Sequence, residues 1–219
     1  MRAKFWLDLW QNNEIAFHKA EHNELLLDYW PRLGLPQNAP VFVPMCGKSL
    51  DMRWLVNAGH SVVGVEIAPV AVQSYFSEAD ECVESCAVDR FVCYQSPSTS
   101  IYQGDFFDLT SPLLDGVQGL FDRGALVALP ADMRFRYVDH LLRIVPERTK
   151  ILLITFEYDQ NLVSGPPHAV LPNEVEKLYG ARCDIQLLES IVTSTLPARF
   201  AEQGVSPVTE SVYLITKVD

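Results

Sequence analysis

Short apolar runs alternate with amphipathic segments along most of this chain, and this alternation constrains the fold more than any other feature. The runs predict strands at 40–45, 61–67, 90–95, 100–109 and 150–158, with another strand that begins at 119 and passes into a loop at 122–124. Helical spacing predicts helices at 4–11, 22–33, 49–59, 69–81, 131–145 and 172–180. Strands that alternate with helices favour a mainly parallel sheet with helices on both faces.

The end of the chain has a different pattern. Residues 183–195 and 210–218 are both β-rich, and only a short helical segment at 197–204 lies between them. A closing pair of this kind predicts an antiparallel edge on the sheet. The 219 residues suit a single domain, with 1–34 as a helical segment within it.

Composition excludes several classes of protein. The net charge of −11 argues against a general nucleic-acid or anionic-membrane surface. No apolar run approaches the roughly 20 residues of a membrane span, and the N-terminus lacks the apolar stretch of a signal peptide. We therefore expect a cytoplasmic protein.

The five cysteines fit a reducing compartment, because their number is odd and they form no C-x-x-C pair. A metal site that combines Cys86 and Cys93 with His60 or His140 is one alternative. Reduced, buried cysteines are the commoner state, so we expect no metal.

The turn after the first strand, at 45–48 (Met-Cys-Gly-Lys), is where an open α/β sheet binds its ligand. A P-loop needs a glycine five positions before its Gly-Lys pair, and Phe42 stands there. A dinucleotide fingerprint needs three glycines, and Gly47 stands alone. The turn therefore does not provide the bare amides that a pyrophosphate requires.

Acidic residues follow the next strands. Glu66 ends the strand at 61–67, where a carboxylate can accept hydrogen bonds from both ribose hydroxyls. A ribose acceptor without a phosphate cradle suits an adenosine ligand such as S-adenosylmethionine; the alternative is a solvated acid. Asp105 precedes Phe106, whose ring we expect to pack on a purine. The alternative there is a capping aspartate followed by core phenylalanines.

Two further segments border the expected site. Arg123 follows Asp122 at a strand end, where it can bind an anionic substrate atom or, alternatively, pair with Asp122 at the sheet edge. Trp6, Trp10 and Phe17 form either an apolar lid over the ligand or an ordinary packed helix. His18 and His22 are four residues apart, as in some metal sites, but with no third ligand nearby a solvated face is favoured.

Together these motifs resemble the thiopurine S-methyltransferase family, in its bacterial form, over nearly the whole chain from Trp6 to Lys217. The matching runs are Trp6 and Trp10 with "AFH" at 16–18, "FVPMCGKSLDMRWL", "AGHSVVGVEI", "FFDL", "FDRGALVALP", "GPPH" and "VYLIT". The resemblance implies a class I methyltransferase with a Rossmann-like, mostly parallel seven-stranded sheet and an antiparallel C-terminal edge strand.

The resemblance also implies roles for particular residues. Cofactor contacts carry over to Trp6, Trp10, Phe17, Met45, Glu66, Phe106 and Arg123. Substrate contacts carry over to Arg123 and Arg199, which are the expected catalytic residues, and the loop at 164–170 is expected to close over the acceptor. His168 in that loop departs from the aromatic residue of some relatives.

The implied reaction is methyl transfer from S-adenosylmethionine, the co-substrate, to a small sulfur, selenium or tellurium nucleophile by direct displacement. We expect a monomer with a small-molecule substrate and neither nucleic acid nor membrane as partner. Arg123 is expected to hold the anionic acceptor, Arg199 to assist, and His18 to be a weaker choice for proton removal. The competing classes are an NAD-dependent oxidoreductase and a non-catalytic module that binds S-adenosylmethionine.

Overall fold

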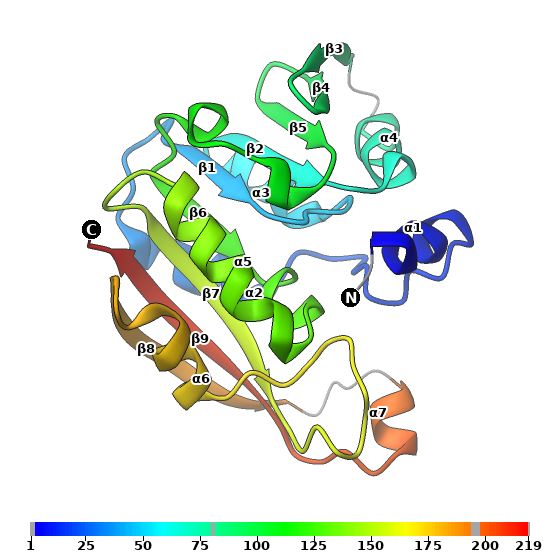
Figure 1. Ribbon diagram of the computed structural model, residues 1–219, viewed down its shortest axis with the longest axis vertical. Coiled ribbons are helices and arrows are strands. Elements are labelled where there is room, and N and C mark those ends of the chain that lie inside the picture. Colours follow the sequence, from blue (N-terminus) through cyan, green and yellow to red (C-terminus); the bar gives the residue numbers. More distant parts are fainter. Residues whose placement is uncertain (1–2, 80–81, 194–197, 219) are drawn as a thin grey trace.

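A computed structural model describes residues 3–79, 82–193 and 198–218, and its centre is one twisted β-sheet (Figure 1). Within these ranges the sheet has nine strands in the order β3-β4-β5-β2-β1-β6-β7-β9-β8. The strands are β1 (Pro40–Val43), β2 (Ser61–Glu66), β3 (Glu84–Val88), β4 (Phe91–Gln95), β5 (Thr99–Gln103), β6 (Gly119–Asp122), β7 (Lys150–Glu157), β8 (Cys183–Thr193) and β9 (Val208–Lys217).

The helices separate these strands in chain order. The α-helices are α1 (Ala3–Gln11), α2 (Glu24–Tyr29), α3 (Leu50–Asn57), α4 (Pro69–Ser77), α5 (Ala131–Ile144), α6 (Pro172–Tyr179) and α7 (Ala198–Glu202). Short 3-10 helices are η1 (Trp30–Leu33), η2 (Phe106–Asp108), η3 (Ser111–Leu114) and η4 (Leu126–Ala128).

The predicted topology is confirmed. Neighbouring strands β5, β2, β1, β6 and β7 are all parallel, and the C-terminal strand β9 runs antiparallel to both β7 and β8. The described sheet has nine strands, where the resemblance implied seven and the sequence pattern predicted eight; β3 pairs with the predicted strand β4, and this hairpin adds to the β5 edge. Strand β3 was missed because most of its residues are exposed and it lacks an apolar run.

Local sequence signals set the ends of the helices. The Ser49 hydroxyl accepts a hydrogen bond from the Asp51 amide at 3.1 Å and caps α3, as predicted. Gly59 follows that helix with a φ of +97°, a conformation that glycine adopts without a Cβ penalty. Pro69 occupies the first turn of α4, where its missing amide hydrogen has no cost.

The core lies on both faces of the sheet, and strand β7 shows this most directly. Ile151 and Leu153 pack into the layer that contains α5 and α6, whereas Leu152 and Ile154 pack into the layer that contains α2, α3 and α4. Successive residues of a strand point to opposite faces, so a strand buried on both sides must be apolar throughout. In the described ranges, no helix has the length and apolar character that a membrane span requires.

The buried strand β7 gives the first prediction. Leu152 is fully buried, and replacing it with alanine leaves a cavity that the sheet cannot close, so Leu152→Ala should lower the free energy of unfolding by about 2–5 kcal/mol. Urea unfolding measures the change. Leu187→Ala on β8, where the side chain is 51% exposed, is the matched control and should cost far less. Equal losses in the two variants would contradict the two-layer core.

Candidate functional site

The turn between β1 and α3 has an unusual backbone that leaves no room for a larger residue at its centre. Met45 and Gly47 both have positive φ angles, +46° and +55°. A Cβ added at Gly47 would lie 3.0 Å from the ring of Trp10. Glycine therefore serves here both for the left-handed backbone and for the close approach of an aromatic ring.

The amides of this turn are used inside the protein. The Cys46 amide donates to the Val65 carbonyl at 2.9 Å, and the Gly47 amide donates to Glu66 Oε2 at 2.8 Å. Amides committed in this way are not available to cradle a pyrophosphate. Cys46 is buried, and this burial raises the pKa of its thiol well above the usual value, so it is suited to packing and not to nucleophilic attack.

Glu66 is fixed at the carboxyl end of β2, directly beside the turn. Its Oε1 accepts a hydrogen bond from the Ala68 amide at 2.8 Å, and its Oε2 accepts the one from Gly47. Burial raises the pKa of Glu66, and these backbone hydrogen bonds oppose the rise. A carboxylate oxygen has more than one acceptor position, so Glu66 keeps capacity for hydroxyl donors.

Three aromatic rings cover this turn. Trp6 and Trp10 each make an edge-on contact with Phe17, with ring centroids 5.3 and 5.5 Å apart. The buried Trp10 also packs against Ala68 and Ala71 at the start of α4. The N-terminal segment therefore lies over the carboxyl ends of the central strands, where α1 is seen at the right of Figure 1.

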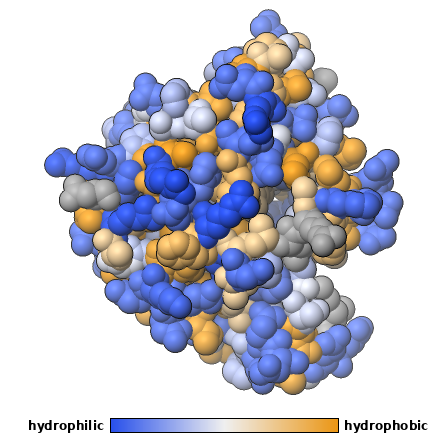
Figure 2. Space-filling view, viewed as in Figure 1, coloured by the Kyte–Doolittle hydropathy of each residue, from blue (hydrophilic) through white to orange (hydrophobic). Residues whose placement is uncertain are grey.

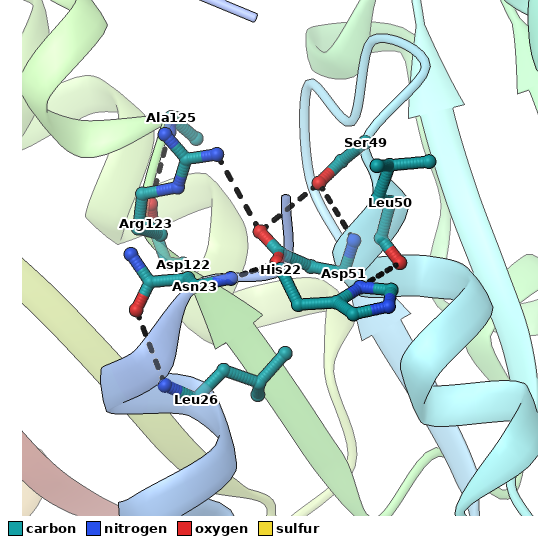
Figure 3. Close-up of polar contacts among 9 residues, drawn as sticks. All are labelled: His22, Asn23, Leu26, Ser49, Leu50, Asp51, Asp122, Arg123 and Ala125. Carbon is teal, nitrogen blue, oxygen red and sulfur yellow. Dashed lines mark hydrogen bonds and ion pairs between the residues drawn. The ribbon is translucent and has the colours of Figure 1, made fainter. Parts of the chain in front are cut away.

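A buried carboxylate on α3 joins the N-terminal segment to the end of β6 (Figure 3). Asp51 Oδ1 accepts from the Asn23 amide at 2.8 Å, and Oδ2 accepts from the Ser49 hydroxyl at 3.0 Å. The same Oδ2 lies 3.4 Å from Arg123 Nη2 in an ion pair. Close by, a ring nitrogen of His22 lies 3.0 Å from the Leu50 carbonyl oxygen. Asp51 thus connects three segments that are distant in sequence.

Arg123 pairs with Asp51 and not with its neighbour Asp122, so the alternative of an Asp122–Arg123 pair is wrong. Asp122 is buried and accepts hydrogen bonds from the Ala125 amide at 3.0 Å and the Tyr137 hydroxyl at 2.7 Å. It therefore shapes the loop that presents Arg123. The Arg123 side chain is 19% exposed, so it is not closed off from solvent by its pairing with Asp51.

Other charges surround this arginine. The pKa of His18 is lowered mainly by burial, next by Lys48, and also by Arg123. The pKa of Glu210 on β9 is raised by burial, and Arg123 is the main influence that opposes the rise. His18 in the N-terminal segment and Glu210 on β9 therefore both interact electrostatically with Arg123. Figure 2 shows the surface hollowed beside the part of the molecule that α1 occupies in Figure 1.

The structure places Phe106 and Met45 differently from the other predicted cofactor residues. The ring of Phe106 is buried in the core, with its centroid 4.9 Å from that of Tyr137. Asp105 caps this segment through the Phe107 amide at 2.9 Å. The alternative of a capping aspartate and a core phenylalanine therefore holds, and the Phe106 carbonyl accepts a hydrogen bond from the Leu109 amide at 3.1 Å. Met45 is half-buried within the turn itself.

Arg199 lies in α7, but its side chain falls outside the part of the chain that the structure describes. In the 164–170 loop, the His168 amide donates to the Val127 carbonyl at 2.6 Å, so this loop is tied to the segment that follows β6. Among the described residues, no group of three or more metal-ligating side chains comes together. His60 contacts Trp30 and the Ala39 carbonyl instead of a cysteine.

Sequence reasoning missed Asp51 and Glu210. Asp51 follows the N-cap Ser49, where an acid is usual for helix capping alone, and Glu210 lies within a β-rich run. One signal could have pointed to Asp51: it lies in the first turn of the helix that follows the turn at 45–48. A cavity of about 310 Å³ lies away from the site, where Gly34, Gln118 and Arg148 line it beside the amino ends of β1, β6 and β7.

Comparisons with known proteins agree with this geometry. The family model "Thiopurine S-methyltransferase (TPMT)" matches residues 1–218. Two similar sequences are a thiopurine S-methyltransferase from Nitrosospira multiformis, 44% identical over 98% of each chain, and a probable thiopurine S-methyltransferase from Yarrowia lipolytica, 41% identical over 97% of this chain and 99% of the relative.

Solved structures resemble the fold at low identity. A 1,6-didemethyltoxoflavin-N1-methyltransferase from Burkholderia thailandensis, solved with S-adenosylhomocysteine, has a TM-score of 0.66 at 14% identity and covers 99% of this chain and 87% of its own. A methyltransferase from Methanosarcina mazei that depends on S-adenosylmethionine has a TM-score of 0.62 at 14% identity, with 90% and 99% coverage. These likenesses concern the fold alone.

The Asp51 network gives the second prediction. Asp51→Ala removes the acceptor for Asn23 and Ser49 and leaves Arg123 unpaired, so the free energy of unfolding should fall by about 2–4 kcal/mol. Urea unfolding measures it. Asp8→Ala is the control, because Asp8 pairs with Lys4 on the surface, and it should leave the midpoint nearly unchanged. If the two variants unfold at the same urea concentration, Asp51 does not join these segments.

Proposed function

This chain belongs to the thiopurine S-methyltransferase family, and from that membership we propose that it methylates the sulfur of small aromatic or heterocyclic thiols, such as thiopurines, with S-adenosylmethionine as donor. The observation that carries the proposal is the pairing of Glu66 with the Gly47 turn. That pair offers a ribose acceptor beside a turn whose amides are already committed, which suits an adenosine ligand without a pyrophosphate.

The residues around the turn fit this donor. Glu66 would accept the ribose hydroxyls, and the turn at 45–47 would contact the amino-acid end of the donor. Trp6, Trp10 and Phe17 would exclude water, with residues 1–34 acting as a lid within a single domain spanning 1–219. The ring of Phe106 would not stack on the adenine of the donor, because it is packed in the core against Tyr137.

Arg123 would bind the acceptor. Bound S-adenosylmethionine supplies a methyl group on a sulfonium sulfur, and we propose that the acceptor takes this group by direct, in-line displacement. Such a step depends chiefly on alignment, so the contribution of the protein is orientation. Asp51 lies 3.4 Å from the Arg123 guanidinium and would hold it in place, and the Arg123 side chain is 19% exposed, so an anionic acceptor could reach it. Arg199 would assist from α7.

The acceptor does not need a strong base. An aromatic thiol is substantially ionised near neutral pH, and a selenol more so, which extends the proposal to selenium and tellurium compounds with the same nucleophilic lone pair. Burial lowers the pKa of His18, so its imidazole is neutral at pH 7 and is able to take a proton from a less acidic thiol. This makes His18 a secondary choice beside Arg123.

We further propose that the protein acts as a cytoplasmic monomer on small molecules, which its net charge of −11 and its free cysteines support. An NAD-dependent oxidoreductase is not favoured, because the turn lacks free amides for a pyrophosphate. An activity assay distinguishes the proposed enzyme from a non-catalytic module that binds S-adenosylmethionine. Tight donor binding without turnover on any thiol, selenol or tellurite would favour that module.

Glu66 gives the third prediction. Glu66→Ala removes charge-assisted hydrogen bonds to the ribose, so donor binding should weaken by about 1.5–3 kcal/mol. Isothermal titration calorimetry with S-adenosylmethionine measures the change, and a parallel unfolding curve shows that the variant is folded. Glu84→Ala on the exposed strand β3 is the matched control. An unchanged affinity of Glu66→Ala for S-adenosylmethionine would contradict the assignment of Glu66 to the ribose hydroxyls.

Arg123 gives the fourth prediction. Arg123→Ala should lower kcat/KM for an aromatic thiol by roughly 10²–10³, the cost of losing a positioned donor in a water-excluded site. Donor affinity should change less than the methylation rate. Arg90→Ala removes an exposed arginine on the β3–β4 turn and is the control. Methylation at the original rate in Arg123→Ala would show that this arginine does not serve the acceptor.

A further inference from the structure

Two cysteines face each other across the hairpin at the β3 edge of the sheet. In the register of this hairpin, Cys86 on β3 is the direct partner of Cys93 on β4. Directly opposed residues of an antiparallel pair point to the same face of the sheet. Both thiols are free, Cys86 is exposed, and Cys93 is 5% exposed.

The spacing brings the two sulfur atoms within reach of a common ligand. Directly opposed Cα atoms lie about 4.5 or 5.5 Å apart, depending on the type of pair. Both values fall within the roughly 4.4–6.8 Å that allows two cysteine sulfurs to be joined. The electrostatics agree, because the pKa of Cys93 is raised first by burial and then by Cys86. The pKa of Tyr102, the β5 partner of Cys93, is raised first by burial and then by both thiols.

The number of thiols at this place indicates which kind of metal or metalloid it can bind. Tetrahedral zinc needs four ligands, and the described residues offer no third histidine, cysteine or carboxylate at this place. An organoarsenic(III) group has two positions that exchange with thiols, and soft thiolate sulfur is the ligand that it prefers. Two opposed thiols therefore match it in both number and chemistry.

We propose that Cys86 and Cys93 form a dithiol site that binds a trivalent organoarsenical. With phenylarsine oxide, two S–H bonds and the arsenic–oxygen bond break, two arsenic–sulfur bonds form, and one water molecule leaves. Arsenic stays trivalent and neither sulfur is oxidised, so the reaction needs no oxidant or reductant. The exposed Cys86 meets the reagent first, and Cys93 closes the ring from the opposite strand.

This site is separate from Arg123 in the proposed methyl-transfer site, because Arg123 follows β6, which is five positions from β3 in the sheet, or roughly 24 Å at about 4.8 Å per strand. Glu66 on β2 is nearer, two positions from Cys93 on β4, or roughly 10 Å. Cys86→Ser on the outermost strand β3 is therefore the substitution that should leave methylation unaffected. The dithiol proposal therefore stands or falls independently of the proposed enzymatic function.

The test is titration of the folded, fully reduced protein with phenylarsine oxide, followed by intact mass spectrometry. We expect one phenylarsenic group per chain, the loss of two titratable thiols, release by 2,3-dimercaptopropanol, and resistance to a simple monothiol. Cys86→Ser and Cys93→Ser should each weaken retention of the phenylarsenic group by about 100-fold, because a single thiol lacks a second thiol held nearby at high effective concentration.

Cys82→Ser is the matched control, because Cys82 is a nearby exposed cysteine outside the hairpin pair, and it should bind as the unmodified chain does. Binding that persists in Cys86→Ser, binding that is lost in Cys82→Ser, or no uptake by the native protein would each overturn the proposal. Cys93→Ser could be destabilised because Cys93 is buried. In that case the exposed Cys86→Ser and Cys82→Ser variants still show whether the hairpin pair binds the reagent.

Discussion

The carboxylate of Glu66 is the contact on which the site depends. It holds the Gly47 amide and the Ala68 amide, each at 2.8 Å, and so joins the turn after β1 to the start of α4. A buried carboxylate is costly unless hydrogen-bond donors surround it, and these backbone amides provide them. The turn keeps its left-handed shape, and Trp10 can then pack against a glycine that has no side chain.

A second carboxylate extends this arrangement. Asp51 is buried at the start of α3 and holds both the backbone where α2 begins and the guanidinium at the end of β6. The N-terminal segment, the ligand-binding turn and Arg123 are therefore linked through one side chain. A chain with an excess of acidic residues uses two of them to organise a candidate site in which the proposed acceptor-binding group, Arg123, is cationic.

Most of the fold was predictable from the sequence, because strands such as β7 are buried on both faces and read as continuous apolar runs. Glycine and serine signals also located the ends of α3 correctly. Strand β3 was not predictable, since an exposed edge strand lacks an apolar pattern. In the candidate site, position after a strand predicted that Glu66 and Arg123 lie at the carboxyl ends of β2 and β6, and their roles stay predictions. The same rule misjudged the ring of Phe106, because position cannot tell which way a side chain points.

The order of strands at the C-terminal side has a consequence for synthesis of the chain. Strand β9 lies between β7 and β8, so β8 has no neighbour in the sheet until residues 208–217 have been made. Strand β8 therefore stays unpaired until β9 has folded beside it. Chain segments with unpaired strand edges are prone to association, and chaperones would have most to protect during this interval.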